Sequence, residues 1–336
     1  MIPLNSSHWQ TTDWQDQLRN MIRDPAELLD RLQLNPEDQP DIAAALADFP
    51  LRVTEAFVAK MKPGDWHDPL LLQILPRAEE MAPSPGYSND PLEEQQANPV
   101  PGIIHKYHGR VLLVSTPACA IHCRYCFRRS FPYGDNRQSS DSWAQALDYV
   151  AGRPEIHEVI LSGGDPLTAP DNYLGQLIEH IAAIPHVRTL RLHTRLPVVL
   201  PARITPSLTN ILTQSRLRTV MVIHCNHHQE LDDATDAAFA QLRGKGVTLL
   251  NQSVLLREVN DNSNDLTLLS HRLFESGVLP YYLHILDKVQ GSRHFSVEVK
   301  EARQLVNTIL KNLPGYLVPK LVREDPGAHS KTPLAL

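Results

Sequence analysis

Residues 119–126 read Cys-Ala-Ile-His-Cys-Arg-Tyr-Cys, so Cys119, Cys123 and Cys126 follow one another at spacings of four and three residues. The chain has one further cysteine, Cys225. Three clustered thiols cannot all pair with one another in disulfides, and nothing else in the sequence marks a secreted protein. The cluster therefore predicts a metal centre.

Two kinds of metal centre fit these thiols. Zinc usually takes four protein ligands in a closed tetrahedral site, and His122 or Cys225 could complete that set. A [4Fe–4S] cluster is also held by thiolates, and a cluster held by only three of them keeps one iron with an open coordination site. The spacing by itself leaves both centres open.

Length and composition set the outer bounds. The chain has 336 residues, 42% of them apolar, which suits one large α/β barrel or two ordinary domains. A net charge of −6 gives no electrostatic footprint for nucleic acid. The first residues lack the pattern of a signal peptide, and no run of eighteen apolar residues occurs. We expect a soluble, cytoplasmic protein without a nucleic-acid or membrane partner.

The first hundred residues favour helices and irregular structure. Asp24 and Pro25 form a typical helix start, with Asp at the N-cap and Pro in the first turn. Two more short helices are expected near residues 42–47 and 53–61, and residues 76–102 are rich in proline and glycine, as in an extended linker. We therefore predict an amino-terminal helical region with its linker over residues 1–100.

From residue 110 onward the sequence alternates between strand and helix patterns. The predicted strands recur about every thirty residues after the first pair, the period of a βα unit. They cover residues 111–115, 158–162, 189–193, 219–224, 248–253 and 281–286. One intervening helix is expected over residues 230–243, ended by Gly244 and Gly246. The pattern predicts an α/β fold, a partial (β/α)6 TIM-type barrel over residues 101–315, followed by a carboxy-terminal segment over residues 316–336.

Chemically distinctive residues follow the predicted strands. In a βα barrel the carboxyl ends of all strands meet at one mouth, where active sites lie, so we expect these segments to converge. They are residues 119–126, Ser162-Gly163-Gly164-Asp165-Pro166, residues 193–195, residues 224–227, Asn251-Gln252 and Asp287. Each also has an ordinary structural interpretation, such as a βα turn for the glycine segment.

The CxxxCxxC spacing with Tyr125 before the last cysteine resembles the radical S-adenosylmethionine (SAM) enzymes. That resemblance implies a [4Fe–4S] cluster on Cys119, Cys123 and Cys126 whose free iron binds SAM and cleaves it to a radical. It also implies that Gly163, Gly164 and Asp165 contact SAM. Cys225 is then interpreted as a small buried residue, because a fourth ligand would close the open iron.

A longer resemblance extends from Arg110 to the end of the chain. The order CxxxCxxC, LSGGDPL, TRLPVVLPARIT, NQSVLLR and finally PGxxxKTP is similar to the lysine 2,3-aminomutase family. By itself Lys331 would be an ordinary lysine near the chain end, and His224 and Gln252 ordinary polar residues of strands. The resemblance implies that Lys331 binds pyridoxal 5′-phosphate (PLP) as a Schiff base, Arg110 the PLP phosphate, and His224 and Gln252 SAM. It further assigns the substrate carboxylate to Arg128, and the substrate ε-ammonium to Asp287 and Glu324, with Glu324 where the free-lysine enzymes have Asp.

The implied reaction is an isomerisation of (S)-α-lysine to (R)-β-lysine, with a reductant such as flavodoxin or ferredoxin. The short end after Lys331, together with Glu324, resembles the branch whose β-lysine is attached to translation elongation factor P by a separate lysine ligase. We therefore expect a functional link to that ligase and that factor. The alternatives are a free-lysine aminomutase of catabolism, a radical SAM enzyme of other chemistry, and a zinc-stabilised binding module.

Overall fold

The computed structural model describes residues 13–38, 42–136 and 140–335. The expectation that the chain has no signal peptide concerns its first residues. Of these, residues 1–12 lie outside the described ranges. The chain forms one nine-stranded sheet whose strands follow one another in sequence order, β1 to β9. Strands β2 to β8 pair in parallel, and β1 and β9 add antiparallel edges. The strands are β1 Ile103–Tyr107, β2 Arg110–Thr116, β3 Glu158–Gly163, β4 Thr189–Thr194, β5 Arg218–His224, β6 Thr248–Leu255, β7 Leu279–Ile285, β8 Lys320–Arg323 and β9 Thr332–Pro333.

The partial barrel predicted from the sequence is confirmed. All six predicted strands occur as β2 to β7, each within two residues of its expected start. The sheet has three strands that we did not predict, β1, β8 and β9. They are short, and two of them lie at the antiparallel edges. Their pairing comes from distant contacts and not from a local sequence pattern.

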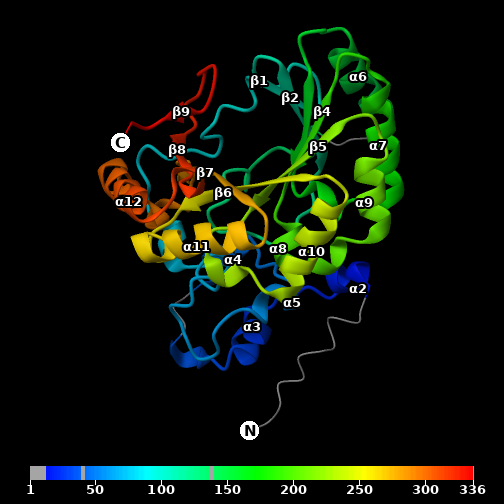
Figure 1. Cartoon of the computed structure of the whole chain (residues 1–336). Helices are drawn as coiled ribbons and strands as arrows, with labels where there is room; N and C mark the ends of the chain where they lie inside the picture. Colours follow the sequence, from blue (N-terminus) through cyan, green and yellow to red (C-terminus); the bar gives the residue numbers. More distant parts are fainter. Residues whose placement is uncertain (1–12, 39–41, 137–139, 336) are drawn as a thin grey trace.

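Helices cover the outer face of the sheet in the order of the strands that they connect (Figure 1). The long ones are α6 Ser140–Ala151, α7 Asp171–Ala183, α9 Pro206–Thr213, α10 Asp233–Gly244, α11 Ser263–Glu275 and α12 Val299–Asn312. Short helical turns join them at α8 Leu196–Val199, η3 Pro166–Thr168, η4 Pro201–Arg203, η5 His228–Glu230, η6 Arg293–Phe295 and η7 Gly315–Leu317. The helix expected over residues 230–243 begins later, because Asp232 acts as the N-cap and accepts from the Thr235 amide.

The amino-terminal part is helical and irregular, as expected. It contains α2 Trp14–Arg19, α3 Pro25–Arg31, η1 Pro36–Asp38, α4 Ala43–Asp48, α5 Glu55–Val58 and η2 Ala78–Met81. Asp24 caps α3 as predicted. The helix predicted over residues 53–61 is wrong in length. Val53 is extended because its amide and carbonyl exchange hydrogen bonds of 3.1 and 2.9 Å with Ile22, so α5 begins only after Thr54.

This amino-terminal part packs against the carboxyl ends of the strands and shares one apolar core with the barrel. The Lys60 ammonium donates to the carbonyls of Val198 (2.9 Å) and Glu230 (2.8 Å), which follow β4 and β5. The Arg124 amide, in the cysteine loop, donates to the Gln73 carbonyl (2.9 Å). The described residues of this part, 13–38 and 42–100, therefore support the loops at the mouth of the barrel. The domain boundaries at residues 100 and 315 stay predictions.

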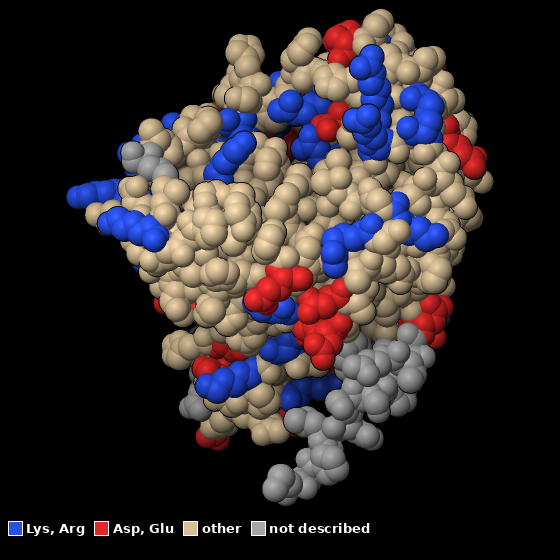
Figure 2. Space-filling view, viewed as in Figure 1, with Lys and Arg blue, Asp and Glu red and all other residues tan. Residues whose placement is uncertain are grey.

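Charged side chains are spread over the visible face of the molecule in Figure 2. On the face shown in Figure 2, Lys and Arg occur in separate groups with Asp and Glu groups among them. In the described ranges, no helix is both long and apolar enough to cross a membrane.

Candidate active site

A cavity of about 650 Å³ lies at the carboxyl ends of the parallel strands. All thirteen residues singled out from the sequence line it, although they come from seven separate segments of the chain. They are Arg110, Cys119, Cys123, Cys126, Arg128, Gly163, Gly164, Asp165, His224, Gln252, Asp287, Glu324 and Lys331. The convergence expected from the barrel topology is present, and the cavity size suits small organic ligands.

The three cysteines of the loop after β2 are free thiols at the edge of this cavity. The loop turns tightly, with the Cys126 amide donating to the Cys123 carbonyl (3.0 Å). Arg195 Nη1 donates to Cys123 Sγ at 2.8 Å. Burial, and then the neighbouring Cys123, raises the pKa of Cys126 to about 11. Three thiolates here thus need a bound cation, and the donors suit a metal cluster.

The spacing of the sulfurs separates the two candidate metals. Among the residues that the structure describes, only His227, His228 and Asp265 place three potential ligand atoms all within 4.8 Å of one another. Sulfurs around one zinc ion lie about 3.8 Å apart, given Zn–S bonds of about 2.3 Å. The three cysteine sulfurs do not all meet the 4.8 Å limit, so their spacing does not favour a single zinc ion. An iron–sulfur cluster, with a separate iron for each sulfur, fits them.

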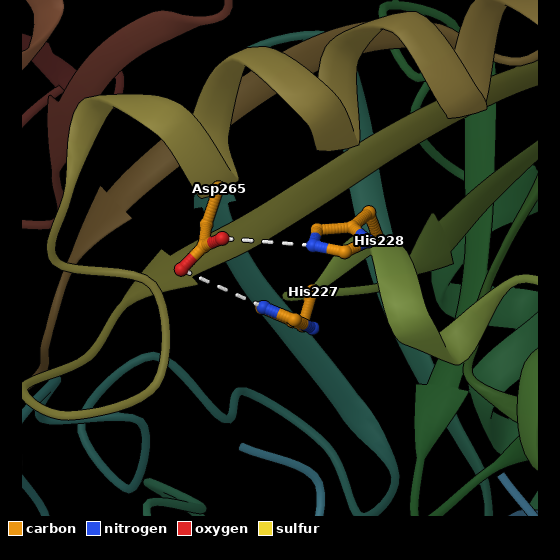
Figure 3. A group of neighbouring side chains, drawn as sticks. All are labelled: His227, His228 and Asp265. Atoms are coloured by element: carbon orange, nitrogen blue, oxygen red, sulfur yellow. Dashed lines mark ion pairs between the residues drawn. The ribbon is translucent and has the colours of Figure 1, made fainter. Parts of the chain in front are cut away.

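The group formed by His227, His228 and Asp265 lies outside the cavity and has a structural role (Figure 3). Asp265, in the first turn of α11, faces His227 Nε2 at 3.7 Å and His228 Nε2 at 3.5 Å. His227 Nδ1 accepts from the Gln229 amide (3.3 Å), so the proton of the neutral ring is on Nε2. That nitrogen points an N–H at Asp265 and offers no lone pair to a metal. The group holds α11 against η5.

Cys225 is fully buried and does not line the cavity. Its thiol donates to the His227 carbonyl (3.4 Å), as expected for a small buried residue and not for a ligand.

A buried polar network lies beneath the cysteine loop, and no local sequence pattern indicates its contacts. The Arg195 guanidinium donates to Glu230 Oε2 (3.0 Å), Gln73 Oε1 (2.6 Å) and the Tyr125 hydroxyl (2.8 Å). Tyr125 in turn lies 2.9 Å from His224 Nε2. Burial, and then Arg195, lowers the pKa of His224 to about 3, so this ring is neutral. The network fixes Tyr125, and with it the cysteine loop, against strands β4 and β5.

The glycine segment after β3 has a packing requirement of its own. Gly163 has a φ of +117°, and a Cβ at Gly164 would lie 2.3 Å from the Ala118 carbonyl oxygen. Neither position tolerates a side chain, because the cysteine loop crosses so closely. The Asp165 carboxylate accepts from the Thr194 hydroxyl and from three backbone amides. It therefore joins the ends of β3 and β4, and its contact with SAM stays a prediction.

The opposite part of the cavity holds a chain of alternating charges. Arg128 Nε pairs with Glu94 Oε2 at 2.7 Å, and Glu94 Oε1 lies 3.4 Å from Lys106 Nζ. Lys106 pairs with Glu324 Oε1 at 3.0 Å, and Glu324 Oε2 accepts from Lys331 Nζ at 2.6 Å. Burial opposes the charge on Glu324, but Lys331 and Lys106 beside it hold its pKa well below the usual range. Neither Glu94 nor Lys106 was singled out from the sequence.

Comparison with known proteins agrees with this geometry. Residues 113–206 match the model of the Radical SAM superfamily. The chain is 51% identical to the L-lysine 2,3-aminomutase of Escherichia coli K12 over 96% of its own length and 95% of the relative. It is 50% identical to the Haemophilus influenzae protein of the same name, over 95% of both chains. To the Clostridium subterminale L-lysine 2,3-aminomutase it is 36% identical, over 96% of this chain and 77% of that one.

The chain belongs to the lysine 2,3-aminomutase family of radical SAM enzymes. The resemblance seen in the sequence is thereby confirmed, and the protein is an enzyme of the aminomutase type, an isomerase. Membership of the family implies three cofactors, a [4Fe–4S] cluster, SAM and PLP. The roles of individual residues toward these cofactors stay predictions.

The cavity of this aminomutase suits PLP in two respects. Lys331 brings a primary amine into the cavity, with a side chain that is 20% exposed. Arg110 lies over the Tyr107 ring at 4.6 Å and forms no ion pair with a carboxylate among the described residues. Its charge is thus available to an anionic group such as a phosphate. His224 and Gln252 are direct neighbours on β5 and β6, on the side predicted for SAM.

Asp287 is a carboxylate without a partner. It follows β7 and lines the cavity, yet its side chain forms no ion pair or hydrogen bond with another described residue. Burial, and then the nearby Glu324, raises the pKa of Asp287 to about 7. A positively charged ligand beside Asp287 would offset both the cost of burying the carboxylate and its repulsion by Glu324.

Proposed function

We propose that this chain converts (S)-α-lysine into (R)-β-lysine, and that the product serves the β-lysylation of translation elongation factor P. The observation that carries the proposed reaction is the charge arrangement of one cavity. Arg128 supplies a cation for the substrate carboxylate, and Asp287 with Glu324 supplies carboxylates for the ε-ammonium. The three thiols and Lys331 line the same cavity. A diamino acid is the class of substrate that this arrangement fits.

The contribution of the chain to the reaction is binding and orientation. When bound, the cluster and SAM supply the radical that removes hydrogen from the substrate, and PLP carries the amino group as it moves between adjacent carbons. Arg128 presents a planar guanidinium to the α-carboxylate, and Asp287 accepts from the ε-ammonium. Aromatic side chains around them, among which are Tyr107, Tyr133 and Tyr282, keep water from the reacting carbons.

The same arrangement selects the length of the substrate. A diamino acid one methylene shorter than lysine cannot reach both charged ends, so one buried charge would lose its partner. Such a mismatch costs more than the loss of a methylene contact, because the unpaired group stays desolvated.

The binding of lysine should weaken in acid because of Asp287. With its pKa at about 7, this carboxyl is protonated at lower pH and cannot hold an ammonium. The lysine ε-ammonium itself stays charged throughout this range. We expect the KM for lysine to rise as pH falls from 8 to 6, by up to about tenfold for each unit below the pKa. Steady-state kinetics over this range measure the effect.

Asp287→Asn is the control for the dependence of the KM on pH. It should raise the KM at pH 8 and remove the acid limb, because no titrating carboxyl remains at this position. An acid limb of unchanged shape in Asp287→Asn would assign the titration to another group.

The proposed reaction is tested by anaerobic reconstitution with iron, sulfide and PLP, followed by SAM, a reductant and L-lysine. Formation of β-lysine, seen by chromatography with mass detection, is the expected result. SAM cleavage without β-lysine would keep the radical chemistry and move the substrate elsewhere. A colourless protein that holds one zinc ion would restore the binding-module alternative. In the cell we propose a cytoplasmic enzyme with flavodoxin or ferredoxin as reductant, because clustered free thiols suit a reducing compartment.

The link to elongation factor P rests on the resemblance of Glu324 and the Ser-Lys-Thr-Pro-Leu segment around Lys331 to that branch of the family. It predicts that a strain without this protein contains elongation factor P lacking the β-lysyl group, as measured by intact-protein mass spectrometry. A fully modified factor in that strain would favour the alternative, a free-lysine aminomutase of catabolism.

A further inference from the structure

Glu94 is a buried carboxylate that faces the cavity. It belongs to the proline-rich segment before β1, where the sequence predicts only a linker. Its side chain is 5% exposed, and it contacts the guanidinium of Arg128 and the ammonium of Lys106. Burial opposes its charge, but Arg128 holds the pKa of Glu94 below the usual range. A charged group so deeply buried and so precisely paired calls for a role in the site.

The contact with Arg128 uses one edge of the guanidinium. Nε donates to Glu94 Oε2 at 2.7 Å, and Nη2 donates to Glu94 Oε1 at 2.8 Å. Nη1 donates to the Ser162 hydroxyl at 3.0 Å. A guanidinium has five N–H donors, so one proton of Nη1 and one of Nη2 are left. They are the donors that the guanidinium still offers to a carboxylate on the side away from Glu94.

The position of Glu94 is itself fixed. Its amide donates to Asp90 Oδ1 at 2.9 Å, within a turn. Close by, the Ser88 amide donates to the Lys288 carbonyl at 2.9 Å, which joins this segment to the residue after Asp287. Lys106 links Glu94 to Glu324. The segment therefore connects the two ends of the proposed substrate site, Arg128 at one and Asp287 with Glu324 at the other.

We propose that Glu94 is a positioning residue, which holds one edge of Arg128 so that the other edge is ready for the substrate carboxylate. This inference rests on the proposed function. Arginine has many rotamers, and ordering it at the moment of binding weakens affinity. A guanidinium already held by Glu94 and Ser162 has lost that freedom before the substrate arrives. A competing role, in which Glu94 occupies the place of the substrate carboxylate, has the opposite consequence, since removing its charge would then improve binding.

The test compares two ligands in the reconstituted enzyme. L-lysine carries the carboxylate, and cadaverine is the same diamine without it. We expect Glu94→Gln to raise the KM for L-lysine about tenfold or more and to change the inhibition constant of cadaverine far less, because cadaverine does not contact Arg128 through a carboxylate. General damage to the site would weaken the binding of both ligands. Glu301→Gln removes a comparable Arg–Glu pair, with Arg257 at 2.6 Å on the surface, and should change neither constant.

Glu94→Asp is the second variant, in case Glu94→Gln does not fold. It keeps the charge but withdraws the carboxylate by one methylene, so we expect a raised KM for L-lysine again. A KM equal to or below that of the wild type, in whichever of the two variants folds, overturns the inference and leaves the proposed function intact. Equal losses for L-lysine and cadaverine also overturn it. If the wild type forms no β-lysine, the proposed function fails, and this inference fails with it.

Discussion

Lys331→Ala is expected to abolish β-lysine formation, lowering the rate by at least about a thousandfold. The reason is chemical, because Lys331 is the lysine that the family resemblance assigns to PLP, and its amine lies inside the cavity 2.6 Å from Glu324. Alanine offers no nucleophile at that place. The variant should also lose the visible absorbance of a PLP Schiff base. Reduction of the wild type with borohydride, followed by peptide mass mapping, should find the cofactor on Lys331.

Lys311→Ala is the matched control. Lys311 lies exposed in the last turn of α12, away from the cavity. This variant should keep both the absorbance and the activity. A Lys331→Ala protein that still forms β-lysine at the wild-type rate would place the Schiff base on another lysine.

Cys126→Ala should remove the iron–sulfur cluster and with it all SAM cleavage. Two remaining thiols cannot hold the cluster and keep one iron open, so the radical reaction cannot begin. We expect iron and sulfide in the anaerobically purified variant to fall to background and its brown colour to disappear. 5′-Deoxyadenosine, the stable product of SAM cleavage, should be undetectable by chromatography.

Cys225→Ala is the control that shows whether loss of the cluster is specific to Cys126 or follows from the removal of any cysteine. Cys225 is buried outside the cavity, and its replacement removes one hydrogen bond to the His227 carbonyl. We expect a stability loss of about 1 kcal/mol and full iron content. If Cys225→Ala lost iron as completely as Cys126→Ala, Cys225 would have to be a cluster ligand.

Much of the fold and part of the site can be predicted from local sequence patterns. Strands β2 to β7 were predicted because apolar runs that recur about every thirty residues reflect the length of a βα unit. The helix start at Asp24 was predictable because a capping side chain acts on amides only a few residues away. The predicted metal ligands Cys119, Cys123 and Cys126 could be recognised because they are close together in the sequence.

Contacts between distant residues escaped the sequence analysis. Arg195 lies in one of the segments singled out after the strands, but no local pattern indicates its contact with Cys123, 72 residues away. Glu94 sits in a stretch whose prolines indicate only a turn-rich linker, and it meets Arg128 across 34 residues. The helix expected at residue 53 was too long because Val53 pairs with Ile22, a partner that no local pattern could supply.

The class of fold and the cluster motif follow from the sequence alone, because they depend on the repeat of apolar runs and on cysteines at short spacings, and Lys331 was assigned through the family resemblance. The tertiary structure decided how these parts meet. It placed thirteen residues from seven segments in one cavity, left Asp287 without an ion pair among the described residues, and set Glu94 against one edge of Arg128. These outcomes depend on distances between segments that only the packing of the whole chain fixes, and they carry the proposal that the cavity binds a diamino acid.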